Sequence, residues 1–147
     1  MHQTATIRDA RGRLCKGLAV LCLLNLAAYT AAYAWVGGDA WNGGIEDGAY
    51  YVGGHFLHSV EGSRTPVTRG VWMYSYLHSI TVWPSLGVFL LAVLALVRPH
   101  IVATFREGAI SGGTVVAILG AIVVLLTAVA TIMFTADFIR AICGSLG

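Results

Sequence analysis

The sequence predicts an all-α integral membrane protein with three transmembrane helices and a long, partly ordered loop between the first two. Hydrophobic residues make up 57% of the 147 residues and charged residues only 11%, whereas a soluble domain carries about a quarter charged residues. The chain also contains three uncharged apolar runs of roughly 20 residues or more, enough to cross a hydrocarbon core about 30 Å thick as helices. This length fits one membrane domain. The net charge of +2 is too small to favour nucleic acid as a partner.

The three runs divide the chain into seven segments. We expect an N-terminal arm (1–16), a first helix (17–36), a long loop (37–72), a second helix (73–97), a short connection (98–108), a third helix (109–136) and a tail (137–147). The first run has a second interpretation, because a basic arm, an apolar stretch and Ala32-Tyr33-Ala34 resemble a secretory signal that is cleaved after Ala34. The bulky Trp35 that follows and the length of the run favour an uncleaved helix.

Basic residues near the helix ends predict the orientation. Those of the arm and the short connection are Arg8, Arg11, Arg13, Lys16, Arg98 and Arg106. The long loop and the tail carry Arg64, Arg69 and Arg140. Since segments rich in Lys and Arg stay in the cytoplasm, we expect the N-terminus inside and the long loop and C-terminus outside. The membrane would be a plasma membrane such as the bacterial inner membrane. This topology separates Cys143 from Cys15 and Cys22, so we expect no disulfide between them.

The second helix has a polar face and an aromatic face. At 3.6 residues per turn, the polar stripe carries Tyr74, His78, Thr81 and Ser85. The opposite stripe carries Trp72, Tyr76, Ile80 and Trp83. We expect the polar stripe to face other helices and the aromatic stripe to face lipid or a neighbour, because unpaired polar groups are costly in hydrocarbon. Pro84 predicts a kink near Ile80.

The other two helices also carry faces suited to packing. On the third helix, small and hydroxyl side chains share one side, at Gly113, Ala117, Gly120, Thr127, Thr131 and Thr135. Such residues allow close approach of helix backbones. The first helix contributes Asn25 and Tyr29, one turn apart. The simplest assembly joins these faces and Tyr74 in a small bundle, although the same faces would suit packing against another subunit.

The long loop carries signs of local structure. Seven glycines lie between Gly37 and Gly54, together with Trp41, Tyr50 and Tyr51. Dense glycine predicts turns and close backbone approach, and the aromatic residues argue against disorder. We expect a loop that lies on the membrane or a partner. The residues from Ser63 to Arg69 should form an extended segment that leads into the second helix.

Two sets of residues are candidates for binding a metal or heme. His55, His58 and Glu61 are three residues apart, which on a helix puts them on one face as a surface metal site requires. Hydrogen-bonded or solvated histidines are the more common reason for this pattern. His78 lies within a transmembrane run, where imidazole tends to be functional. It could ligate heme together with Met133, relay protons, or donate an interhelical hydrogen bond, the last being the more frequent use.

No known catalytic motif appears, so an enzyme is the less favoured interpretation. The first hypothesis is a non-catalytic accessory or assembly subunit of a larger membrane complex. Its partners would be other membrane subunits or a second copy of the chain, together with lipid. The alternatives are a small heme- or metal-binding membrane protein and a membrane immunity or regulatory protein. No cofactor is predicted on the first hypothesis, and heme or a divalent metal on the second.

Overall fold

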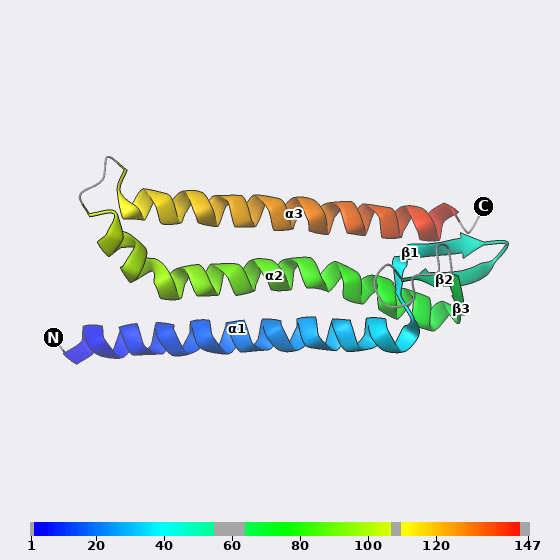
Figure 1. Ribbon diagram of the computed structural model, residues 1–147, viewed down its shortest axis with the longest axis horizontal. Coiled ribbons are helices and arrows are strands. Elements are labelled where there is room, and N and C mark those ends of the chain that lie inside the picture. The colour runs from blue at the N-terminus through cyan, green and yellow to red at the C-terminus, as the bar shows by residue number, and fades with distance from the viewer. Residues whose placement is uncertain (1, 55–63, 107–109, 145–147) are drawn as a thin grey trace.

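A computed structural model describes residues 2–54, 64–106 and 110–144 (Figure 1). The elements in chain order are α1 (His2–Val36), β1 (Asp39–Glu46), β2 (Ala49–Gly53), β3 (Arg64–Val67), α2 (Arg69–Thr104) and α3 (Gly112–Gly144). We call the end of the molecule that carries the strands the sheet end. The opposite end, where α2 leads into α3 and the N-terminus lies, is called the loop end (Figure 1).

The chain is mostly helical, and three of its helices are long and apolar enough to cross a membrane. This result confirms the three-helix prediction. Each helix extends beyond the predicted range, because helical structure continues through the charged residues that end each apolar run. α2, for example, begins at Arg69, where the Thr68 side chain accepts a hydrogen bond from the backbone N–H of Val71 and so caps the helix.

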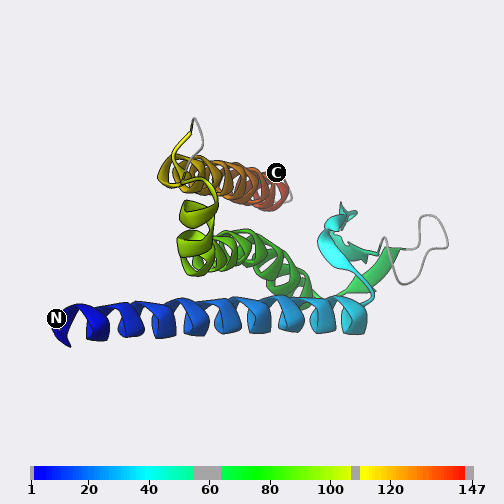
Figure 2. The same ribbon diagram turned by 60° about the vertical axis from the view of Figure 1, so that its left-hand side comes forward.

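The helices form an open row in which α2 lies between α1 and α3 (Figures 1 and 2). α2 packs along both neighbours, whereas α1 and α3 do not pack extensively against each other. The closed bundle that the sequence suggested is therefore not formed. An open row is stable in lipid because acyl chains cover exposed apolar side chains as well as protein does.

α1 contacts α2 along one narrow stripe. The half-buried residues recur every three or four positions, at Cys15, Ala19, Cys22, Asn25, Tyr29 and Ala32. Most residues between them are exposed, including Leu21 and Leu24. This spacing is that of a two-helix seam, which keeps one helix face toward its partner. α1 is therefore held by a single line of contacts.

The segment between α1 and α2 contains a three-stranded antiparallel sheet in the order β1-β2-β3. The all-α prediction was wrong in this respect. The Ser63–Arg69 segment was expected to be extended, and β3 confirms this for Arg64–Val67, whereas Arg69 already begins α2 and Ser63 lies outside the described residues. β1 and β2 form a hairpin in which Glu46 pairs with Ala49. The two turn residues, Asp47 and Gly48, both have positive φ angles, as a tight two-residue hairpin turn requires.

Close backbone contacts explain the glycines of this segment. A Cβ on Gly43 would overlap the carbonyl group of Tyr51, and a Cβ on Gly53 would overlap that of Asn42. The pairing of β1 with β2 is irregular between Asp39 and Gly44. The two strand backbones lie so close at Gly43 and Gly53 that no side chain fits there. The prediction of close backbone approach from dense glycine is confirmed.

The largest fully buried side chains of the described residues lie at the sheet end. Trp72 is 1% exposed and Val52 0%, and Phe138 of α3 packs against Trp72 and Tyr76 with ring centroids 6.2 and 5.1 Å apart. The aromatic face of α2, which was expected to contact lipid or a neighbour, is therefore buried within the chain at Trp72 and Tyr76. The reason is that the sheet and the end of α3 cover it.

Close packing also joins α2 and α3 at the loop end. Figure 1 shows the last turns of α2 bending toward α3. Pro99 lies in these turns, and proline removes a helical hydrogen bond and favours such a bend. Gly112 is buried against the backbone of Val102, where a Cβ would clash. The start of α3 therefore depends on glycine at this position.

Candidate functional site

A buried carboxylate lies where α1, α2 and β1 meet. α1 ends at Val36, and the N–H groups of Gly37 and Gly38 both donate to the carbonyl of Tyr33 at 3.0 Å. Both glycines have positive φ angles, which L side chains rarely adopt, so glycine is the residue suited to this helix end. The reversal carries the next residue, Asp39, back over the helices, where it is 7% exposed.

Both carboxylate oxygens of Asp39 accept hydrogen bonds. The Tyr29 hydroxyl donates to Oδ2 at 2.9 Å and the backbone N–H of Asn42 donates to Oδ1 at 2.8 Å. A buried carboxylate without donors would be very costly. The two donors thus permit burial, and the bond from Tyr29 fastens β1 to α1.

Two buried serines lie under β1, and one of them, Ser75, fastens the strand to α2. The backbone N–H of Ala40 donates to Ser75 Oγ at 3.1 Å. Ser79 Oγ donates to the carbonyl of Ser75 at 3.0 Å. Both serines are less than a tenth exposed. Since polar atoms in such a place are costly unless paired, these bonds define where the strand lies on the helix.

His78 adjoins this cluster on the side of α1. Its Nδ1 lies 3.1 Å from the Tyr74 hydroxyl, one turn earlier on the same helix. The imidazole also meets the Tyr29 ring edge-on, with centroids 5.4 Å apart. His78 is therefore an interhelical packing residue in this structure. Tyr74, which was expected to lie inside a bundle, has 55% of its surface exposed.

The crevice beside His78 is small. It is lined by Tyr29, Tyr33, Gly38, Ser75 and other residues of the junction, and its volume is about 10 Å³. That is room for about one water molecule, whereas small-molecule sites usually occupy several hundred Å³. A porphyrin on His78 would therefore require α1 and α2 to separate, or it would lie on the helix surface.

Met133, the other candidate heme ligand, does not lie beside His78. Met133 is 59% exposed on α3, the helix on the other side of α2 from α1, and the structure shows no contact between Met133 and His78. His55, His58 and Glu61 lie outside the described residues. Within the described ranges, no group of three His, Cys, Asp or Glu side chains could hold a metal ion.

Three of the predicted packing residues lie at helix contacts. Asn25 Nδ2 donates to Ser85 Oγ at 2.9 Å between α1 and α2, which satisfies an amide at the depth of the apolar run. Gly120 faces Leu91 across the α2–α3 contact.

Thr127 is the third packing residue and faces Gly87 of α2, where a Cβ would lie 2.8 Å from its Oγ1. Thr131 is partly buried and donates to the carbonyl of Thr127 within its own helix. Gly113 has open space beside it: among the described residues, a Cβ there would approach only the hydroxyl of Ser111 within 4 Å. The glycine and threonine stripe of α3 is therefore used mainly inside the chain.

A second hollow lies at the sheet end, between the β1–β2 hairpin and the last turns of α3. It has a volume of about 530 Å³ and is lined by Ile45, Asp47, Tyr50, Arg140 and neighbouring residues. Arg140 pairs with Asp137 at 3.0 Å. We call this hollow the hairpin groove. It could not be predicted from the sequence, because it arises from two segments about ninety residues apart.

Trp41 and Trp83 flank one phenylalanine of α3 near the same end. The Trp41 ring stacks on Phe134 with centroids 4.7 Å apart and 19° between planes. Trp83 meets Phe134 from α2 at 5.5 Å. These contacts join the sheet, α2 and α3, so Trp83 packs against a neighbouring helix.

Comparison of the chain with protein-family models, with curated proteins and with solved structures finds no match.

Proposed function

We propose that this protein is a non-catalytic accessory or assembly subunit of a larger membrane complex and that it contacts its partner through the sheet end. The observation that supports the proposal is the folded cap at that end, which combines the buried core with an exposed, partly polar groove. In a bare membrane anchor, a fixed surface of this kind would have no use.

The polar cluster supports a positioning role for the cap. Asp39 and Ser75 take part in hydrogen bonds that join β1 to α1 and to α2, and Ser79 donates to the carbonyl of Ser75 within α2. Satisfied buried networks make a local structure rigid and unique. A rigid surface loses little conformational entropy on binding, which favours affinity for a partner.

The exposed residues of the cap are of kinds that bind proteins well. Trp35 is 92% exposed and Trp41 45%, and both lie at the sheet end. Arg140 borders the hairpin groove opposite the turn that contains Asp47. Tryptophan and arginine are enriched among the residues that dominate binding energy at interfaces. The groove itself offers the charged groups and the ring of Tyr50, and the two tryptophans lie outside it at the same end of the molecule.

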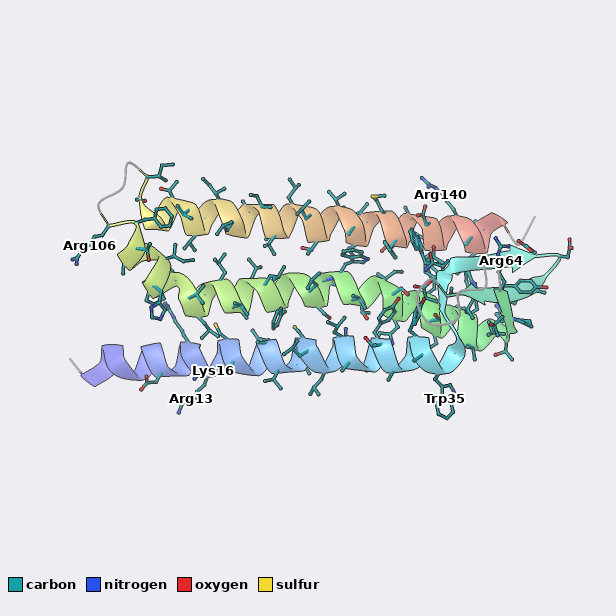
Figure 3. All side chains as sticks on the ribbon, in the orientation of Figure 1. Arg13, Lys16, Trp35, Arg64, Arg106 and Arg140 are labelled. Carbon is teal, nitrogen blue, oxygen red and sulfur yellow. The ribbon has the colours of Figure 1, made fainter. Side chains whose placement is uncertain are left out.

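We further propose that the N-terminus and the loop end face the cytoplasm of a bacterial plasma membrane, with the sheet end outside. The support is the basic residues at the loop end, among them Arg13, Lys16 and Arg106 (Figure 3). Segments rich in such residues stay on the cytoplasmic side. The partner surface would then be extracytoplasmic.

The test is purification of the tagged full chain from its own membranes in mild detergent. We expect other membrane proteins in stoichiometric amounts. The double variant Asp47→Arg/Arg140→Glu should reduce their recovery at least several-fold, whereas Arg106→Glu at the loop end should not. Recovery of a lone chain with an activity of its own would overturn the proposal. A heme absorbance band that is lost in His78→Ala would replace it with the cofactor-binding alternative.

A further inference from the structure

The two ends of the molecule differ in how their charges are paired. At the sheet end, Arg64 pairs with Glu46 and Arg140 with Asp137. At the loop end, the basic side chains that the structure describes are Arg11, Arg13, Lys16, Arg98 and Arg106. None of these five has an ion-pair partner among the described residues. We call these five residues the basic belt.

The net charge of the two ends has opposite sign. Among residues 9–16 and 98–106 of the loop end, whose side chains the structure describes, the belt supplies five positive charges and Asp9 one negative charge, for a net +4. The described residues of the sheet end carry three positive and four negative charges, for a net −1. Exposed like charges at one end repel one another unless counter-charges are supplied. The chain does not supply them from its described residues.

Two residues of the belt, Lys16 and Arg98, lie where the apolar runs of α1 and α2 end. Going from the apolar run toward the loop end, the first charged side chain on α1 is Lys16, and on α2 it is Arg98. Gly17 to Val36 is 20 residues, which at 1.5 Å per residue spans about 30 Å of helix. That is the thickness of a hydrocarbon core, so Lys16 and Arg98 would lie at the level of the lipid phosphates.

The belt surrounds the loop end and does not form one pocket. Figure 3 shows Arg13 on the side of α1 away from α2, and Arg106 beyond the end of α2, next to the connection to α3. A ring of cations suits several ligands that arrive laterally in the membrane plane. A single soluble anion would be better held by a convergent pocket, as in bidentate arginine sites.

We propose that the basic belt binds the headgroups of anionic phospholipids, which form a retained shell around the loop end. Arginine and lysine at the membrane surface attract such lipids by about 1 kcal/mol each, which corresponds to roughly five-fold in affinity per residue. The attraction is electrostatic and therefore weakens as salt screens it. This inference does not depend on the proposed subunit function.

The experiment measures lipid binding to the purified full chain in detergent micelles by native mass spectrometry. In micelles the result does not depend on the direction of membrane insertion. Phosphatidylglycerol and phosphatidylcholine are titrated separately. We expect several phosphatidylglycerol molecules to bind at least ten-fold more tightly than phosphatidylcholine. The variant Arg13→Gln/Lys16→Gln should lower the phosphatidylglycerol affinity by roughly 25-fold or less, in line with two lost cations.

The matched control removes two cations at the other end, in Arg64→Gln/Arg69→Gln, and should leave lipid binding unchanged. Arg13→Lys, which keeps the charge, should retain most of the affinity. Equal binding of the two lipids would overturn the proposal, as would an equal loss in the control variant. Competition by millimolar inorganic phosphate as strong as by the lipid would also overturn it, because the ligand would then be a free anion.

Discussion

Removal of the Tyr29 hydroxyl tests whether the Asp39 cluster holds the sheet in place. In Tyr29→Phe, Asp39 keeps the donor from the Asn42 backbone but loses the one from α1. A hydrogen bond to a charged group contributes about 1.5–3 kcal/mol, and a buried acceptor that loses its donor carries a desolvation cost. We therefore expect Tyr29→Phe to lower the free energy of unfolding by about 2 kcal/mol.

The assay is reversible unfolding of the purified chain in mixed detergent micelles, followed by tryptophan fluorescence, since Trp72 lies in the adjoining core. Tyr74→Phe is the matched control: it removes a hydroxyl from the same kind of residue, but one that is mostly exposed, and should cost less than about 0.5 kcal/mol. Combination of Tyr29→Phe with Asp39→Asn gives a double-mutant cycle. The coupling energy should be about 1 kcal/mol or more.

Equal costs for Tyr29→Phe and Tyr74→Phe would refute this reasoning, because burial of the acceptor would then make no difference. A coupling energy near zero would refute it as well, since the two side chains would not depend on each other. In either case the sheet would be held mainly by apolar packing around Trp72 and Val52.

Two further predictions concern the helix contacts and the topology. Gly87→Ala should destabilise the chain by about 1–3 kcal/mol, because the new Cβ meets Thr127 at 2.8 Å. Gly120→Ala, with 3.8 Å to its neighbours, should be neutral or slightly stabilising. Thermal unfolding in detergent compares the two variants, and similar losses of stability would contradict the packing described for these two glycines. An impermeant thiol reagent added to intact cells should label Cys143, which is exposed, and not Cys15, and the reverse pattern would contradict the proposed orientation.

The helices could be predicted from the sequence because lipid imposes a simple requirement. An uncharged run of the right length must become helical to satisfy its own backbone groups, and no knowledge of neighbours is needed. The packing roles of Asn25, Gly120 and Thr127 followed from similar local rules. Each is a small or polar residue within an apolar run. If it faced lipid, a polar side chain would be unfavourable there and a small one would serve no packing contact.

The sheet and the polar cluster could be predicted only in part. Glycine density indicated close backbone contacts, and the segment before α2 was expected to be extended, but strand pairing joins segments whose register local rules do not determine. Because the sheet was not predicted, the sequence did not show what would cover Trp72. The aromatic stripe that contains Trp72 was therefore expected to face lipid or a neighbour. Asp39 was missed because its partner Tyr29 meets it only after the chain reverses at Gly37.

The position of the core under the sheet has a consequence for how this protein is made. In a membrane, each helix can insert by itself, because its apolar side chains are already in a suitable solvent. Trp72 and Val52 come together only when the segment between α1 and α2 folds at the membrane surface, where water is present and apolar burial is favourable. If the three helices cross a membrane as we propose, helix insertion and tertiary folding are separate steps for this chain, the first driven by lipid and the second by water.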